Sequence, residues 1–204
     1  LHRPWDSTQL PMRRFDTYLP YVPSQKEVWD FIQSFSNLKH KAVISLMYSS
    51  GLRVREVCAL RYEDISRSSM RIHICHSKAR SDRYAILSQK ALDILTQYWF
   101  RAGNPRGFLF PNRNDPQRPM AAYTVNQFIF AKETELGMEH RFTCHTFRHA
   151  FGTHLYENGT DLLTIKALLG HKSLNSTTIY VHLASNGTAN AVSPFDRMGG
   201  VLHE

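Results

Sequence analysis

Apolar residues recur every three or four positions along most of the chain, which is the spacing of amphipathic α-helices. In the stretch 25–35 they all fall on one helical face, and Ser24 with Glu27 three residues later predicts a capping box at its start. The same pattern predicts further helices over residues 38–50, 53–61, 88–101, 123–136, 144–157, 161–169 and from about 173 onward.

Two short segments have the character of β-strands. Residues 70–75 alternate apolar and polar positions, residues 83–87 form a second β-like run, and the polar segment between them predicts a hairpin loop. A third short strand is expected around residues 107–110, within a loop over 102–120 that is rich in Gly, Pro, Asn and Arg. The pattern therefore predicts an α+β fold that is mostly helical, with one small three-stranded antiparallel sheet.

The two ends of the chain lack this periodicity. Residues 1–20 carry three prolines and are expected to be a linker or arm, and residues 187–204 a C-terminal tail. The tail has enough apolar side chains to dock on a neighbouring protomer, and a disordered end is the alternative. Residues 21–186 are expected to form one domain. Because the chain begins with Leu1, we expect it to be a fragment of a longer protein.

Charge narrows the choice of partner. The 25 Lys and Arg against 17 Asp and Glu give a formal net charge of +8, which favours a polyanion such as nucleic acid over a basic protein without such a partner. No run of 18 apolar residues predicts a membrane span. Cys58, Cys75 and Cys144 form no CxxC pair, so neither a zinc framework nor a disulfide scaffold is expected, and each is predicted to be a small buried hydrophobe.

The predicted helix 144–157 combines an apolar face with a polar one. On a helical wheel the polar face holds His145, Arg148, His149, Gly152 and Tyr156. The small Gly152 would let another backbone approach closely. His154 falls on the apolar side and is predicted to be a core histidine with satisfied hydrogen bonds.

Two histidines four residues apart, at 145 and 149, share the spacing of the HExxH zinc motif, but the chemistry does not match. Thr146 stands where the general-base Glu is needed, and Arg148 would place a positive charge beside a cation. We therefore expect no metal site on this helix. Further along the chain, His171 directly follows Gly170, and Tyr180 comes nine residues later; by itself Tyr180 reads as a half-buried core residue.

Five segments, in this order, resemble the tyrosine recombinase (phage integrase) family. They are GLRVRE at 51–56, a lysine-bearing hairpin at 76–83, HTFRH at 145–149, LLGH at 168–171 and TTIYVH at 177–182. The resemblance covers nearly all of residues 21–185. It implies the tyrosine recombinase catalytic fold and a metal-independent, cofactor-free enzyme that cuts and rejoins double-stranded DNA through a 3′-phosphotyrosine intermediate. It also implies a tetramer on two duplexes and a cytoplasmic, nucleoid-associated location.

The resemblance also implies a role for each motif residue. Arg53 and Arg148 would bind the scissile phosphate, and Lys78 would protonate the leaving 5′-oxygen. His145 would act as acid and base at the nucleophile, which would be Tyr180. The remaining implied role is a hydrogen bond from His171 to a phosphate oxygen. Glu56 lies three residues after Arg53, and this spacing predicts that it orients that arginine; a solvated charge on the helix surface is the alternative.

The residue types fit this chemistry independently of the resemblance. Forked guanidinium groups match the oxygens of a phosphodiester, which gain charge as it is attacked. A phenol with a pKa near 10 needs a base or positive surroundings to attack at neutral pH. Two alternatives stay open: a type IB topoisomerase-like enzyme, and a DNA-binding module without activity, against which the complete set of six catalytic groups argues. The target DNA site and the choice between integration, excision and resolution do not follow from the sequence.

Overall fold

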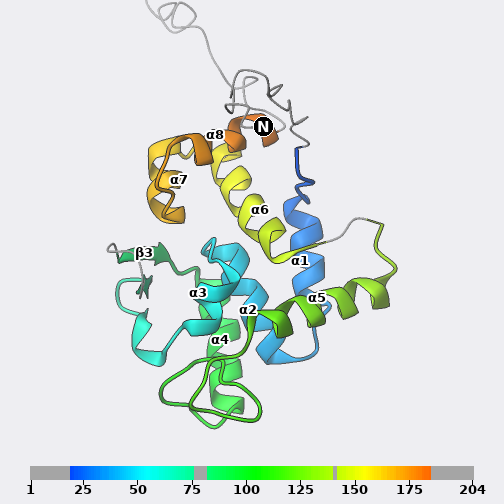
Figure 1. Ribbon diagram of the computed structural model, residues 1–204, viewed down its shortest axis with the longest axis vertical. Coiled ribbons are helices and arrows are strands. Elements are labelled where there is room, and N and C mark those ends of the chain that lie inside the picture. Colours follow the sequence, from blue (N-terminus) through cyan, green and yellow to red (C-terminus); the bar gives the residue numbers. More distant parts are fainter. Residues whose placement is uncertain (1–18, 76–81, 140–141, 185–204) are drawn as a thin grey trace, which may run out of the picture.

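A computed structural model describes residues 19–75, 82–139 and 142–184 of the chain. Most of these residues are helical, and the helices lie close to the positions that the periodicity predicts (Figure 1). Their bounds are α1 Gln25–Gln33, α2 Leu38–Ser49, α3 Val54–Ala59, α4 Gln89–Arg101, α5 Ala122–Leu136, α6 Cys144–Glu157, α7 Leu162–Leu169 and α8 Asn175–Leu183, with a 3₁₀ turn, η2, at Tyr62–Asp64.

A three-stranded antiparallel sheet is present, as predicted, in the order β1 (Ile65–Ser66), β2 (Arg71–Ile74) and β3 (Arg83–Ile86). The prediction of its third strand was wrong. That strand is β1, whereas Phe108 of the expected segment forms only an isolated bridge with Arg61. Two residues are too few for β1 to show alternation.

Local signals at the ends of the helices agree with the structure in most places. The capping box at α1 is present: Ser24 accepts from the backbone N–H of Glu27, whose side chain accepts from Ser24. The apolar spacing in α5 predicts that Val125, Phe128, Ile129 and Leu136 face the core, and the first three do so. Leu136 does not and is 46% exposed, because the chain turns away at the following left-handed Gly137.

The core consists of two clusters. In the larger one, α2 is buried on every side between α4 and α6, and the phenylalanine rings of α1, α6 and the segment before α6 stack on one another. The smaller one comprises Phe151, Ile165, Leu169 and Tyr180, and it fixes α7 and α8 to α6. As Figure 1 shows, α6 thus connects the α1–α5 body to the end of the molecule formed by α7 and α8.

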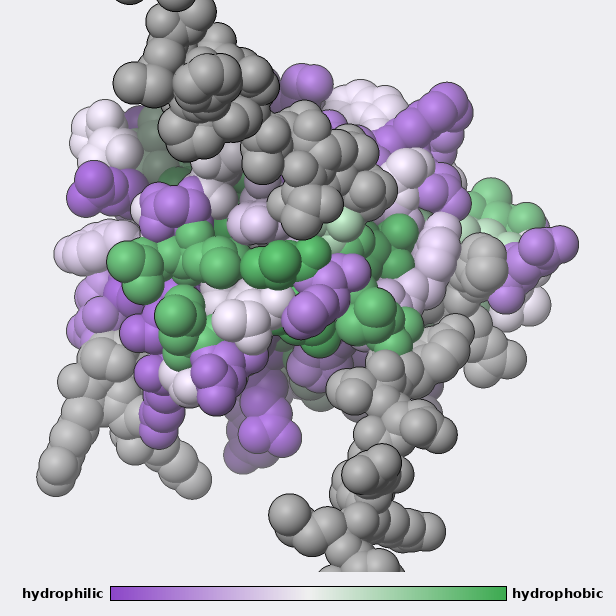
Figure 2. All heavy atoms as spheres, turned by 90° about the horizontal axis from the view of Figure 1, so that it is seen from above, coloured by the Kyte–Doolittle hydropathy of each residue, from purple (hydrophilic) through white to green (hydrophobic). Residues whose placement is uncertain are grey.

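The surface at this end is partly apolar. Figure 2 views it and shows hydrophobic side chains in a band between hydrophilic ones. Leu163 on α7 is 67% exposed and Leu174, just before α8, 41%. No helix of the described residues is both long and apolar enough to cross a membrane.

The cysteines do not all behave as predicted. Cys58 and Cys144 are buried, in agreement with the sequence analysis. Cys75 is exposed, so the prediction of a buried hydrophobe was wrong there. It directly follows the last residue of β2, where the sheet ends.

Candidate active site

Helix α6 is the structural centre of the site. It begins at the predicted residue because Thr143 caps it, accepting a hydrogen bond from the backbone N–H of Thr146. The face predicted to be polar is largely covered: α7 and α8 pack against α6, and Arg148 is only 5% exposed. A helical wheel gives the faces of one helix but does not show which later elements cover them.

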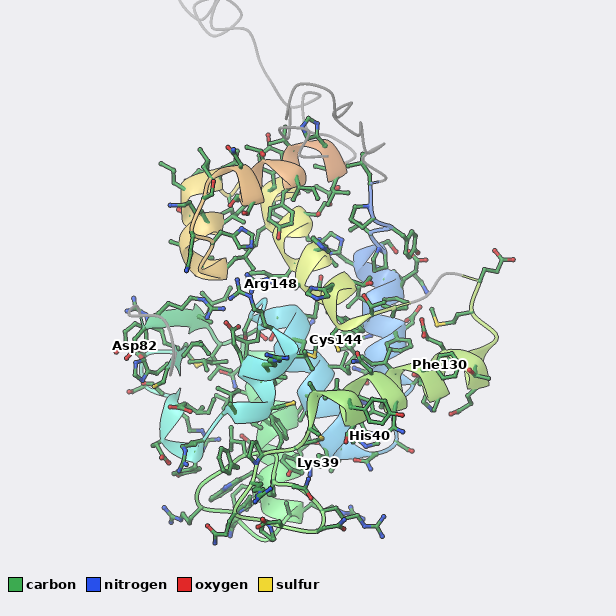
Figure 3. The ribbon with its side chains drawn as sticks, viewed as in Figure 1. Lys39, His40, Asp82, Phe130, Cys144 and Arg148 are labelled. Atoms are coloured by element: carbon green, nitrogen blue, oxygen red, sulfur yellow. The ribbon has the colours of Figure 1, made fainter. Side chains whose placement is uncertain are left out.

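Arg148 joins three segments of the chain. Its Nη1 donates to the carbonyl oxygen of Gly51 at 2.5 Å and its Nη2 to that of Leu169 at 2.6 Å. Figure 3 shows it at the junction of α6 with the segment that leads into α3. Burial and then the charge of Arg53 lower the pKa of Arg148 to about 10, so it remains a cation at neutral pH.

Arg53 and Glu56 lie at the start of α3, where Glu56 is buried between two guanidinium groups. Its Oε1 accepts from Nη1 of Arg53 at 2.9 Å, and its Oε2 accepts from the backbone N–H of Arg53 and from Nη2 of Arg83 at 2.8 and 2.9 Å. Burial disfavours the charged carboxylate, but the two arginines outweigh it and lower the pKa of Glu56. Glu56 is thus a fixed anion that holds two cations in place.

Arg83 is a part of this site that sequence reasoning missed. Its side chain is 9% exposed, and its Nε donates to the carbonyl oxygen of Leu168 at 3.2 Å. A Cβ added to Gly170, whose φ is +64°, would lie 2.6 Å from its Cδ. One signal was available: Arg83 is two residues before the buried Ala85 in β3, so strand alternation places it on the inward face.

Tyr180, on α8, is buried against α6. It is 1% exposed, and a Cβ added to Gly152 would lie 2.5 Å from its Cζ. The close approach expected at Gly152 is therefore made by this ring rather than by a backbone. Burial raises the pKa of Tyr180, although the charges of Arg148 and Arg53 act in the opposite direction.

His171 follows the left-handed Gly170 that ends α7, and its ring stacks near Tyr180 with 6.2 Å between centroids. Its Nδ1 lies 3.0 Å from Oγ1 of Thr177. Burial, followed by the charges of Arg148 and other nearby cations, lowers the pKa of His171 to about 4. In the free protein it is therefore a neutral imidazole at physiological pH.

Helix α6 carries three histidines, and each has a different environment. His145 is exposed near the start of the helix. His149 lies between it and Tyr180, with ring centroids 6.5 Å from His145 and 6.2 Å from Tyr180. His149 has no role among those that the family resemblance implies, yet its ring lies beside that of the tyrosine. His154 is a satisfied core histidine, as predicted, with Nδ1 3.0 Å from the hydroxyl of Tyr48.

The arrangement is suited to binding an anion. Two guanidinium groups, those of Arg53 and Arg83, pair with the carboxylate of Glu56. The guanidinium group of Arg148 adds a third positive charge nearby, which leaves a positive surplus beside the phenol of Tyr180. Such forked donors match the geometry of phosphate oxygens. Lys78, the sixth predicted group, lies outside the described residues.

Comparisons with known proteins agree with this chemistry. The model of the phage integrase family matches residues 24–186. A Sinorhizobium fredii protein named as an integrase/recombinase is 36% identical over 197 residues, which are 96% of this chain and 78% of that protein. A tyrosine recombinase of Thermosipho africanus is 33% identical over 85% of this chain and 61% of its own length.

Solved structures share the fold. The crystal structure of the XerA recombinase superposes with a TM-score of 0.76 at 26% identity, over 83% of this chain and 63% of that one. The Tn1549 transposon integrase, solved in complex with a circular intermediate DNA, superposes with a TM-score of 0.68 at 19% identity, over 87% of this chain and 65% of that one. The chain thus spans less than two thirds of each of these solved chains.

Proposed function

This chain belongs to the phage integrase family, and we propose that it is a site-specific DNA recombinase acting through a covalent 3′-phosphotyrosine. The observation that carries the proposal is the position of Tyr180, a buried phenol beside His171 and within the field of two arginines. Such a group needs positive surroundings to act as a nucleophile at neutral pH.

In the proposed reaction, the scissile phosphate binds between the guanidinium groups of Arg53 and Arg148. The Oη of Tyr180 attacks the phosphorus and loses its proton to His145, so that a phosphotyrosyl ester forms on the 3′ side. The bond from phosphorus to the 5′-oxygen breaks, and Lys78 supplies the proton to that oxygen. A positioned acid of this kind contributes roughly 10²–10⁴-fold to the rate.

His171 stabilises the charge that develops during attack. As a neutral imidazole with its proton on Nε2, it accepts at Nδ1 from the hydroxyl of Thr177, and Nε2 can then donate to a non-bridging phosphate oxygen. Rejoining reverses the steps with the 5′-hydroxyl of a second strand as the nucleophile. The phosphotyrosyl ester preserves the energy of the broken bond, so the exchange needs no ATP and no metal ion.

Tyr180 must leave its buried position before it attacks, because its ring packs on Gly152 and is almost inaccessible to solvent. DNA binding supplies a reason for that movement. A phosphate between Arg53 and Arg148 would compete for the donors that Arg148 now gives to the carbonyl oxygens of Gly51 and Leu169. Those contacts hold the end of α7, from which the chain leads to α8 and Tyr180.

The proposed partner is double-stranded DNA, bound by a catalytic domain over residues 21–186 with an arm at 1–20 and a tail at 187–204. The net charge of +8 supports this partner. We propose that the working form is a tetramer on two duplexes at the nucleoid, and the apolar band at the α7–α8 end offers a surface for protomer contacts. The two terminal segments lie outside the described residues.

The proposal is tested with nicked duplexes that trap the covalent intermediate, built on a site first selected from random DNA. The wild-type chain should give a protein–DNA band that survives denaturation, and Tyr180→Phe should not. The matched control is Tyr156→Phe, since Tyr156 packs on the same apolar cluster but lies on α6. An unchanged band in Tyr180→Phe would show that another residue is the nucleophile.

A topoisomerase-like activity would use the same covalent chemistry without exchanging partners. The relatives described above are integrases and recombinases, which favours exchange. Incubation with two differently labelled duplexes distinguishes the two activities, because only a recombinase yields a product that carries both labels. DNA binding with no adduct under any condition would instead support an inactive binding module.

A further inference from the structure

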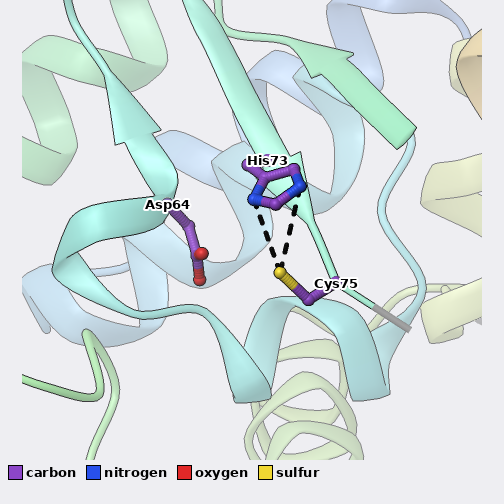
Figure 4. Close-up of side chains that lie close together, drawn as sticks. All are labelled: Asp64, His73 and Cys75. Carbon is purple, nitrogen blue, oxygen red and sulfur yellow. Dashed lines mark hydrogen bonds between the residues drawn. The ribbon is translucent and has the colours of Figure 1, made fainter. Parts of the chain in front are cut away.

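A second group of reactive side chains lies at the outer end of the sheet, apart from the phosphate site. Asp64 directly precedes β1, His73 lies in β2 and Cys75 directly follows β2 (Figure 4). Residues 73 and 75 are two apart in an extended segment and share a face, and the pairing of β1 with β2 brings residue 64 alongside. One ligand atom from each of the three lies within 4.8 Å of the other two.

The separation of these atoms matches a metal site. Sγ of Cys75 lies 3.4 Å from Nδ1 of His73. In a tetrahedral zinc site, with bonds of about 2.3 Å to sulfur and 2.0 Å to nitrogen, the two ligand atoms lie about 3.6 Å apart. Sγ also lies 4.0 Å from Nε2, so a cation between the sulfur and Nδ1 would fit once the imidazole turns to point Nδ1 at it.

The second nitrogen of the imidazole has a carboxylate beside it. Nε2 of His73 lies 3.3 Å from Oδ2 of Asp82, so the nitrogen away from Cys75 faces a carboxylate. The ring also stacks on Tyr84 of the neighbouring strand, with centroids 5.1 Å apart. A carboxylate on the far nitrogen fixes the tautomer of histidines that bind zinc and makes the metal-facing nitrogen more basic.

Asp64 is likewise held in place. Its Oδ2 accepts the backbone N–H of Arg61 at 2.7 Å, and a carboxylate has a second oxygen available for a metal. Asp82, which lies 3.3 Å from His73, is a second carboxylate of this corner.

We propose that Asp64, His73 and Cys75 bind a thiophilic divalent cation, Zn²⁺ in the first place, with water as the fourth ligand. A thiolate, an imidazole and a carboxylate suit zinc and cobalt, whereas magnesium and calcium prefer oxygen ligands alone. The site is accessible, because Cys75 is exposed and His73 is 34% exposed. The bound ion would join β1 to β2 and, through Asp82, the start of β3.

No step of the proposed strand transfer uses the metal, so its binding is tested without DNA. The untagged 204-residue chain, reduced and freed of metal with a chelator, is titrated with Co²⁺. Binding should produce the near-ultraviolet charge-transfer band of a cobalt–thiolate bond together with the visible bands of tetrahedral cobalt. Zn²⁺ should remove both, and it should raise the melting temperature of the wild-type chain.

Variants assign the signal to the site. Cys75→Ser should abolish the charge-transfer band, whereas Cys144→Ser should retain it, because the buried Cys144 donates to Asn126 far from this corner. Asp82→Asn should keep the band but weaken the affinity by about 10- to 100-fold. The proposal is overturned if excess Co²⁺ gives no band, if Cys75→Ser retains it, or if Zn²⁺ raises the melting temperature of Cys75→Ser as much as that of the wild type.

Discussion

At the scale of single residues, the buried carboxylate of Glu56 decides how the cations of the site are arranged. It pairs with Arg53 on its own helix and with Arg83 on a distant strand. Both Glu56 and Arg83 are nearly inaccessible, so removing one leaves the charge of the other less well compensated. Arg83 also connects β3 to the end of α7 through Leu168.

Replacing Arg83 by methionine should therefore destabilise the protein. The expected loss is about 3–5 kcal/mol in the free energy of unfolding, measured by urea denaturation, because a buried ion pair is broken from one side. Arg83→Lys should lose less, since it keeps the charge but not the forked contact. The double variant Arg83→Met, Glu56→Gln should recover part of the loss; if the two single losses simply add, Arg83 does not act through Glu56.

The lowered pKa of His171 predicts a pH dependence. Its pKa is about 4 in the folded protein against an ordinary value of 6.5, so between these values the unfolded chain binds more protons than the folded one. Stability should accordingly be full above pH 6.5 and fall as the pH decreases toward 4. His171→Asn should reduce this slope in urea midpoints measured from pH 7.5 to 4.5. If the slope is unchanged in His171→Asn, the loss of stability at low pH comes from the other buried histidines.

At the scale of elements, the contact of α8 with α6 is close enough to allow only glycine at one position. The ring of Tyr180 occupies the space where a side chain at position 152 would begin. This contact fixes the position of α8 relative to α6, and it also buries Tyr180, the proposed nucleophile.

Gly152→Ala should force α8 away from α6. Overpacking of this kind costs about 1–3 kcal/mol in the free energy of unfolding. Because Tyr180 must leave this position before it attacks, we expect the DNA adduct to form no more slowly than in the wild type, with little change in DNA affinity. Combining it with Tyr180→Ala should cost less than the sum of the two single changes, because the new methyl group then has room. Strict additivity in urea denaturation would contradict the contact.

At the scale of the whole molecule, charge and shape serve different purposes. The excess of Lys and Arg is spread along the chain and is suited to a long polyanion. The guanidinium groups of Arg53, Arg83 and Arg148, in contrast, lie together in the candidate active site. Association should therefore be governed by many phosphate contacts, and chemistry by one of them.

DNA affinity should fall steeply with salt. If the chain contacts six to ten phosphates, raising salt from 50 to 200 mM should weaken binding by roughly 10³–10⁵-fold. Arg53→Ala should reduce the slope of log affinity against log salt by about one, which fluorescence anisotropy can measure. Lys26→Gln is the control, because Lys26 is 85% exposed and pairs with Asp30 on α1. Equal slopes for wild type and Arg53→Ala would remove Arg53 from the phosphate contacts.

The sequence by itself determined the features that depend on neighbours along the chain. The apolar and polar faces of a helix are set by residues three or four positions apart, and the start of α1 is set by Ser24 and Glu27. The helices and the pairing of β2 with β3 could therefore be predicted from the sequence. The motifs carrying Arg53, Arg148, His171 and Tyr180 were also visible in the sequence, because each is a short local pattern.

Only the tertiary structure decided which groups meet. Arg83 reaches Glu56 across 27 residues and Arg148 reaches Gly51 across 97, so no local spacing records either contact. The same holds for the two-residue strand β1, which brings Asp64 to His73, and for Tyr180, whose burial depends on α8 folding back onto α6. Periodicity states which face of an element is apolar, but the packing of distant segments determines what covers it.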